Sequence, residues 1–174
     1  MGVWAMIETQ NLLVRQYSLQ DIDELFPILS DAKTMSFWPS PFTWDDVRAW
    51  INRSLESNAH PGLGRCAVVL KETQKIIGDC GIVKVTMAGE LVNDLGYIIH
   101  HQYWGNGYAT EAAIALKDYG FNRLNLDALY ANMPYNHDAS RRVAEKLGMQ
   151  KIKEFDNPRN RGIRTFLYAV YRNL

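Results

Sequence analysis

One stretch of the sequence decides the fold: Leu95-Gly96-Tyr97-Ile98-Ile99-His100-His101-Gln102-Tyr103-Trp104-Gly105-Asn106-Gly107-Tyr108-Ala109-Thr110-Glu111-Ala112. The apolar run that ends at Ile99 is typical of a strand, and two glycines, Gly105 and Gly107, follow it closely. Beyond them, small and apolar residues recur at helical spacing as far as Gly120. The stretch therefore predicts a strand, a glycine-bearing turn and a helix.

Such a turn is a candidate site for an anion. The first turn of a helix has N–H groups without partners and the positive end of the helix dipole, and glycine lets a phosphate approach the backbone. We expect the amides of residues 106–109 to bind a diphosphate, with the Thr110 hydroxyl beside them. A tight strand-to-helix turn without a ligand would have the same pattern.

Two other nucleotide-binding motifs do not match this stretch. The dinucleotide-binding motif requires glycine or alanine three residues after Gly107, where this chain has Thr110. It also requires an acidic residue at the end of the next strand, where this chain has Asn132. A phosphate-binding loop of the Gly-Lys-Ser/Thr type requires a lysine that the turn lacks. Neither motif explains the glycines.

Around this stretch, the chain predicts an α/β (α+β) fold in a single domain of residues 1–174. Its length suits one domain, and 47% hydrophobic with 22% charged residues is typical of a folded protein. Apolar alternation and turn residues predict strands at 7–15, 66–70, 76–85, 91–99, 128–132, 151–155 and 165–171. Helical spacing and capping residues predict helices at 18–29, 43–58, 109–120 and 139–147.

Composition excludes several classes of partner. The chain has 19 basic and 19 acidic residues, so no broad field attracts nucleic acid. Residues 1–5 lack the features of a signal peptide and no run of about 18 apolar residues occurs, so we expect a cytoplasmic protein without a membrane partner. The four histidines, His60, His100, His101 and His137, lack a metal-ligand spacing, and we expect no metal.

The residues of the turn resemble the GNAT superfamily of N-acetyltransferases, within it the branch of ribosomal-protein N-terminal acetyltransferases. Its signature, Gln/Arg-x-x-Gly-x-Gly/Ala, is met by Gln102, Gly105 and Gly107, inside the longer family phrase from Leu-Gly-Tyr to Ala-Thr-Glu-Ala. A second signature, an Asn shortly before Ser-x-Arg-Val-x-Glu-Lys-Leu-Gly-Met, matches Asn136 and residues 140–149.

The resemblance implies the GNAT fold, a mixed and mostly antiparallel sheet of six or seven strands flanked by about four helices. Its parallel strands 4 and 5 splay apart and admit the pantetheine arm of acetyl-CoA. The implied activity moves an acetyl group from acetyl-CoA directly to a primary amine, either the α-amine of a protein N-terminus or a small-molecule amine, in a monomer or homodimer. The alternative is a catalytically weak acyl-CoA-binding module.

The resemblance also implies which residues contact the cofactor. In the splayed region, the backbone of residues 97–99 would pair with pantetheine. Arg141, with Arg142, would meet the phosphates unless both simply lie on a solvated helix face. The implied cofactor site comprises Tyr97, Ile98, Ile99, Gln102, Gly105, Asn106, Gly107, Tyr108, Ala109, Thr110, Asn136, Ser140 and Arg141. His137 competes with Asn136, because the family usually spaces this Asn three residues before the serine, and here the spacing is four.

Two residues are candidates for catalysis. Asp94 stands where many relatives have a Glu before Leu-Gly-Tyr, and we expect it to act as the base, unless it is an ordinary charged residue at a strand edge. Many relatives have a tyrosine at the position of Ala144, so Ser140 becomes the candidate to contact the departing sulfur. The other interpretation of Ser140 is a helix cap.

The aromatic residues Phe37, Trp38 and Trp44 lie between the first two predicted helices, where the resemblance places one wall of the acceptor site. Core packing would explain them equally well. The amine itself must be neutral to attack: at pH 7 roughly a tenth of an α-amine is neutral, but only about one part in a few thousand of a lysine. An α-amine therefore demands less of the base.

Overall fold

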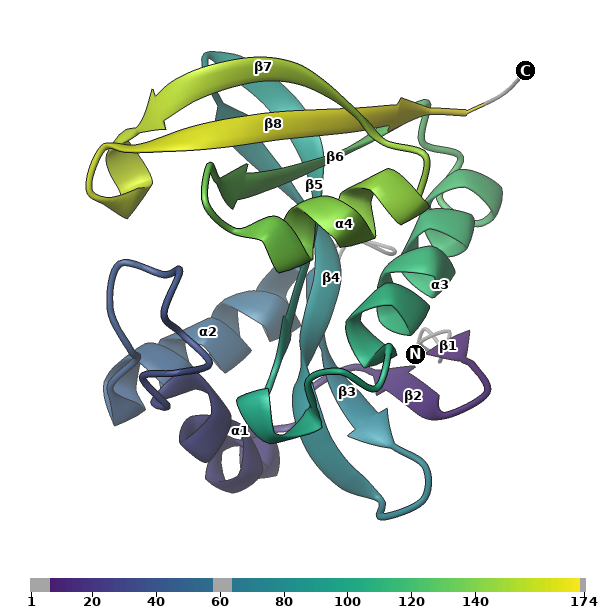
Figure 1. Ribbon diagram of the computed structural model, residues 1–174. Helices are drawn as coiled ribbons and strands as arrows, with labels where there is room; N and C mark the ends of the chain where they lie inside the picture. Colours follow the sequence, from purple (N-terminus) through teal and green to yellow (C-terminus); the bar gives the residue numbers. More distant parts are fainter. Residues whose placement is uncertain (1–6, 58–63, 173–174) are drawn as a thin grey trace.

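The computed structural model describes residues 7–57 and 64–172 and has one mixed sheet of eight strands (Figure 1). The strands are β1 (Ile7–Glu8), β2 (Leu12–Arg15), β3 (Gly64–Leu70), β4 (Lys75–Met87), β5 (Glu90–Ile99), β6 (Ala128–Pro134), β7 (Gln150–Asn157) and β8 (Ile163–Tyr171). The helices are α1 (Ile22–Leu29), α2 (Trp44–Ser57), α3 (Tyr108–Asn122) and α4 (Asp138–Lys146), with short 3-10 turns η1 (Leu19–Asp21), η2 (His101–Tyr103) and η3 (Pro158–Asn160). The order across the sheet is β1-β2-β3-β4-β5-β6-β8-β7.

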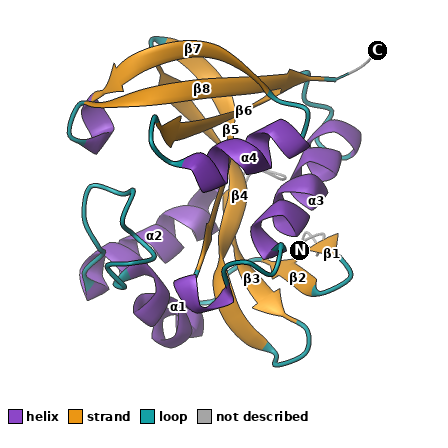
Figure 2. Ribbon diagram, in the orientation of Figure 1, coloured by secondary structure: helices purple, strands orange, loops and turns teal. Residues whose placement is uncertain are grey.

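The helices cover both faces of the sheet. Helices α1 and α2 lie on one side, and α3 and α4 on the other (Figures 1 and 2). Alternation along β3 supplies both cores: Val68 and Leu70 pack into the cluster under α3 and α4, whereas Ala67 and Val69 join the cluster under α1 and α2. A central strand buried on both faces explains the nearly continuous apolar run in this part of the sequence.

The opening segment differs from the single strand expected over residues 7–15. A turn divides it into β1 and β2, and the amide of Thr9 donates to the carbonyl of Leu12 (3.0 Å). The Thr9 hydroxyl in turn accepts from the Leu12 amide (3.0 Å). Because the side chain of Thr9 bonds locally, the chain reverses, and the sheet has eight strands instead of six or seven.

The expected helix starts are confirmed by their caps. The amide of Thr43 donates to the Asp46 carboxylate (2.9 Å), and the amide of Asp46 donates to the Thr43 hydroxyl (3.2 Å). The amide of Ser18 donates to Asp21 (2.7 Å) at the start of η1, which leads directly into α1. These reciprocal bonds satisfy donors that a helix start leaves open.

Strands β5 and β6 splay, as expected for the fourth and fifth strands of the family fold. Strand β5 pairs with β4 over its whole length, from Glu90 to Ile99, but with β6 only at Asp94 opposite Tyr130. Two side-chain bonds also join the strands near this point: the Asn132 amide donates to the Asp94 carboxylate (3.0 Å), and the Asn93 amide donates to the carbonyl of Ala128 (3.3 Å). Beyond it the sheet opens toward the C-terminal ends of both strands.

Among the described residues, no helix combines the length and the apolar character that crossing a bilayer requires.

A buried polar network fastens α2 to the sheet on the side of α1. Asp79 of β4 is fully buried and accepts hydrogen bonds from the Arg65 guanidinium (2.6 Å), the Trp50 indole (2.9 Å) and the Tyr17 hydroxyl (2.5 Å). A buried charge is tolerated only when it is paired and hydrogen-bonded. Asp79 and Arg65 therefore form one neutral unit between α2 and the sheet.

We predict that Asp79→Asn lowers the free energy of unfolding by about 3 to 5 kcal/mol, because it leaves the Arg65 charge buried without its carboxylate. For a chain of this size, the melting temperature should fall by roughly 6 to 20 °C. Thermal unfolding measures the change. The control Glu8→Gln removes an exposed partner of Lys71 and should leave the melting temperature nearly unchanged. Equal shifts in both variants would contradict the prediction.

Candidate active site

The gap between β5 and β6 is the middle of a large cavity of about 980 Å³, a size typical of small-molecule sites. One end is bounded by the turn before α3 and by one side of α4. The other end is bounded by α2, the loop between α1 and α2, and the η3 turn. The cavity therefore reaches from one face of the sheet to the other.

The backbone of β5 presents peptide groups to this gap. The amide of His100 donates to the carbonyl of Ile77 on β4 (2.9 Å), and alternate residues of a strand direct their peptide groups to opposite edges. Tyr97 and Ile99 therefore direct their peptide groups away from β4 and toward the gap. The carbonyl of Ile99 accepts from the Trp104 indole (2.7 Å). The other groups remain available to an extended ligand that binds like a strand.

The glycine turn has the geometry of an anion site. Gly105 and Gly107 both have φ of +81°, a left-handed conformation that other residues rarely adopt, and a Cβ added to either would meet nothing within 4 Å. The space above them is therefore open. Helix α3 begins at Tyr108, and its first backbone bond runs from the Glu111 amide to the Gly107 carbonyl (2.9 Å).

Helix geometry leaves the amides of residues 108–110 without an acceptor inside α3, at the positive end of its dipole. Tyr108, Ala109 and Thr110 all line the cavity. The Asn106 side chain instead donates to the carbonyls of Tyr103 (3.0 Å) and Trp104 (3.4 Å), which fixes the turn. The residues present thus suit a diphosphate.

The comparisons with known proteins agree with this geometry. Residues 11–150 match the family model described as an acetyltransferase (GNAT) domain. The chain belongs to the GNAT acetyltransferases. It is 32% identical to the uncharacterized N-acetyltransferase YnaD of Bacillus subtilis (strain 168), over 83% of this chain and 82% of that protein. It is also 32% identical to the uncharacterized protein YkkB of the same strain, over 83% of this chain and 88% of YkkB.

Solved structures of GNAT proteins share the fold. The GNAT-family acetyltransferase of Bacillus anthracis superposes with a TM-score of 0.82 at 26% identity, over 96% of this chain and 98% of that one. The ribosomal-protein-S5-alanine acetyltransferase of Vibrio fischeri has a TM-score of 0.80 at 20% identity, over 96% of each chain. The chain is therefore an acetyl-CoA-dependent N-acetyltransferase by family, and its acceptor is a separate question.

In this GNAT site, Asp94 lies where β5 and β6 part. Burial raises the pKa of its carboxyl, while the hydrogen bond from Asn132 and the charges of Arg65 and Arg159 act in the opposite direction. A carboxylate whose pKa is raised is a stronger base than an exposed one. Asp94 lines the cavity between the two halves of the sheet.

Ser140 and Tyr97 meet across the gap. The Tyr97 hydroxyl lies 3.0 Å from the Ser140 hydroxyl, and either oxygen can donate. Burial raises the pKa of the Tyr97 phenol to about 12, so it keeps its proton at neutral pH. Helix α4 begins at Asp138 with His137 as its N-cap residue. Ser140 therefore lies inside the first turn and is not the cap.

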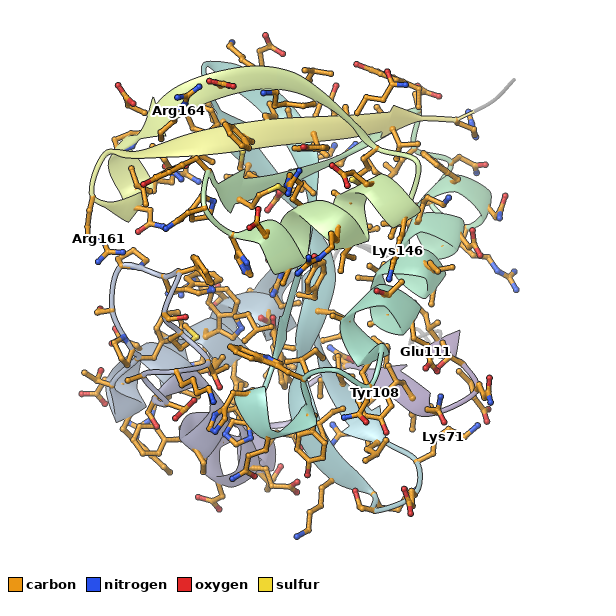
Figure 3. The ribbon with its side chains drawn as sticks, viewed as in Figure 1. Lys71, Tyr108, Glu111, Lys146, Arg161 and Arg164 are labelled. Carbon is orange, nitrogen blue, oxygen red and sulfur yellow. The ribbon has the colours of Figure 1, made fainter. Side chains whose placement is uncertain are left out.

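The aromatic residues expected at the acceptor site separate into two groups. Phe37 and Trp38 line the cavity, and the buried Asn160 of η3 donates to the carbonyl of Phe37 (2.8 Å). Arg161 lies above the same loop (Figure 3) and donates to the carbonyl of Trp38 (3.4 Å). Trp44 is not part of the wall: it packs edge-on against Phe26.

Four expected cofactor residues also lie outside the cavity wall: Gln102, Asn106, Asn136 and Arg141. Gln102 and Asn136 are exposed, and Arg141 pairs with Asp138 (3.0 Å) and Glu145 (3.7 Å) of its own helix. In contrast, His137 lines the cavity and stacks on Phe37, with ring centroids 3.7 Å apart. Of the two competing residues, the structure brings His137 to the cavity.

Several cavity residues were not expected from the sequence. Lys146 lines the cavity near α3 (Figure 3), and it follows Ser140 and Val143 at three-residue intervals on one face of α4. This three-residue spacing could have identified Lys146 as a cavity residue from the sequence. Arg53 of α2, Arg65 of β3 and Arg159 of η3 line the end of the cavity that α2, the loop between α1 and α2, and η3 bound, here named the acceptor end. No motif marks them, since they come from three distant segments.

One group of possible metal ligands is present in the described residues. Ligand atoms of Asp31, His100 and His101 lie within 4.8 Å of one another. The His101 ring bonds to the Asp31 carboxylate (2.8 Å), and the His101 amide donates to Thr34 (3.0 Å). This contact ties the loop after α1 to the end of β5. The expectation of no metal stays a prediction.

We predict that His137 makes the fold sensitive to acid. Burial lowers the pKa of its ring to about 4, against about 6.5 in an unfolded chain. Between these values the unfolded state binds more protons, so the free energy of unfolding falls as pH falls. His137→Phe keeps a ring on Phe37 without the titration. From pH 7 to pH 5, the wild type should lose about 1 to 2 kcal/mol more than the variant, allowing for partial exposure.

Urea denaturation at the two pH values measures this difference directly. Equal losses of stability in the wild type and the variant on acidification would show that His137 titrates normally.

Proposed function

We propose that this chain acetylates an α-amine, with Asp94 as base and the Tyr97–Ser140 pair beside the departing sulfur. One observation carries the proposal: a single cavity joins the glycine turn, the inward peptide groups of β5, the two hydroxyls and Asp94. Pantetheine is long enough to reach from a diphosphate at α3 into the gap, and it would pair with β5 like a strand.

The reaction is a direct transfer. The lone pair of the neutral amine forms a bond to the acetyl carbonyl carbon, the carbon–sulfur bond breaks, and the coenzyme leaves as a thiolate. The amine proton passes to the Asp94 carboxylate, directly or through one water, and later to solvent. Since the cavity holds both reactants in one orientation, proximity supplies much of the acceleration.

The acceptor follows from the strength of the base. Roughly a tenth of an α-amine is already neutral at pH 7, whereas a lysine amine is almost wholly protonated. A single carboxylate, even one with a raised pKa, suits the more acidic ammonium ion. An α-amine is therefore the favoured acceptor, either in a small molecule or at a protein N-terminus. One structural neighbour is named as a ribosomal L7/L12 alpha-N-protein acetyltransferase.

The departing thiolate needs a hydrogen bond. Ser140 supplies the hydroxyl of α4, and Tyr97 can donate to it so that the Ser140 proton points at the sulfur. This pair replaces the helix tyrosine that is absent at Ala144. The comparisons give no support to a catalytically weak binding module, since relatives such as YnaD are named as N-acetyltransferases.

We predict that the purified protein, given acetyl-CoA and a panel of α-amines, releases CoA and yields products heavier by one acetyl group. Asp94→Asn should lower kcat by about 10²- to 10³-fold, because the base is lost, with little change in the KM for acetyl-CoA. Asp118→Asn, an exposed residue of α3 outside the cavity wall, is the matched control. Full activity of Asp94→Asn would reject Asp94 as the base.

We also predict that Ser140→Ala and Tyr97→Phe each lower kcat by about 10-fold, since each breaks the same hydrogen-bonded unit. The double variant should be little worse than either single variant, because groups that act as a unit are not additive. Steady-state assays of kcat with one acceptor measure this double-mutant cycle. If the loss in the double variant equals the product of the two single losses, the two hydroxyls act independently.

A further inference from the structure

The acceptor end of the cavity has an uneven distribution of charge. Its described wall contains three arginines, Arg53, Arg65 and Arg159, but Asp94 is the only Asp or Glu in the whole wall. None of the residues outside the described part of the chain is Asp or Glu in the sequence. No carboxylate side chain from those segments can therefore balance the arginines.

Arg65 does not contribute net charge to this end. It is buried, and its guanidinium is paired with Asp79, which the Tyr17 and Trp50 side chains also bond. The Arg65–Asp79 unit is neutral as a whole. The uneven charge is therefore due to Arg53 and Arg159.

Arg53 and Arg159 are both exposed cations at the mouth of the cavity. Within the described part of the chain, neither forms an ion pair within 4 Å, although Arg53 lies close enough to Asp46 to act on its pKa. Asp94 supplies a single negative charge for the amine. A bound ammonium or amine at Asp94 leaves two guanidinium groups beside the rest of the acceptor.

Arg159 is held in place by its backbone. Its amide donates to the Asn157 side chain (3.0 Å), and the next residue, the buried Asn160, bonds to the carbonyl of Phe37. The η3 turn is thus fixed against the aromatic loop, and Arg159 lines the cavity. Its charge acts on the Asp94 carboxyl, so the two groups share one electrostatic environment.

We infer that the acceptor carries a carboxylate near its amine, and that Arg159, assisted by Arg53, binds that carboxylate. The inference rests on the acetyl transfer proposed above and names the acceptor's chemistry. A guanidinium fork matches a carboxylate in shape and charge. Trp38 and Trp50 form the wall beside it, so an aromatic or apolar side chain fits between the two charges. Such a carboxylate belongs either to a free α-amino acid or to an acidic residue near a peptide N-terminus.

Matched acceptors test the inference. We would compare each of several α-amino acids with its carboxamide and its decarboxylated amine, and peptides with acidic against neutral second and third residues. The readout is kcat/KM from CoA release, expressed per neutral amine, because an acid, its carboxamide and its decarboxylated amine differ in the pKa of the amine. For one of the two sources, the acid should exceed its neutral partner by at least about 10-fold, and the preference should shrink in high salt because screening weakens charge pairing.

Variants then assign the preference to a residue. Arg159→Gln should reduce the ratio of acid to neutral acceptor to within about 3-fold, while Arg159→Lys should keep most of it. Arg48→Gln, on the exposed side of α2 and outside the cavity wall, is the control and should keep the wild-type ratio. A ratio that Arg159→Gln leaves unchanged would overturn the role of Arg159.

The outcomes separate the two proposals. Turnover of α-amines that lack a carboxylate, with no preference for those that have one, would overturn this inference and keep the acetyl transfer to α-amines. Absence of turnover with every acceptor, in a protein that melts cooperatively, would overturn both. Preference for the acidic peptides over free amino acids would support the carboxylate and identify its source as a polypeptide.

Discussion

The loss of pairing between β5 and β6 after Asp94 is the constraint on which the site depends. Strand β5 keeps its bonds to β4 as far as Ile99, and β6 keeps its bonds to β8, so each half of the sheet stays rigid while the gap between them remains open. Buried backbone groups require partners. The peptide groups that β6 does not satisfy therefore form a ready edge for an extended ligand, and the helices on both faces complete the walls.

The two halves are positioned by contacts far from the gap. On one face, the Asp79 network fastens α2 to β3 and β4, which sets the acceptor wall. On the other, Glu111 of α3 accepts from the Asn11 amide (2.7 Å) and fixes the glycine turn against the opening hairpin. The stack of His137 on Phe37 and the Asn160 bond join the halves over the acceptor end. The two halves are thus joined beside the cavity as well as at Asp94.

Local signals were sufficient for much of the fold and for the glycine turn before α3. Thr43 and Asp46 predicted a cap, and Gly105 and Gly107 predicted a turn between a strand and a helix, because these patterns act within a few residues of sequence. The extra turn at Thr9 was missed because one side chain, bonding to its neighbours, decides it. The arginines of the acceptor end could not be predicted, because Arg53 and Arg159 reach the cavity wall only through the packing of distant elements.

A crystal structure of the protein with CoA tests this arrangement most directly. We predict a diphosphate on the amides of residues 108–110 and a pantetheine chain between β5 and β6, bonded to the peptide groups of Tyr97 and Ile99. Electron density for CoA outside the gap, or strands β5 and β6 paired beyond Asp94 so that no ligand can enter, would contradict it.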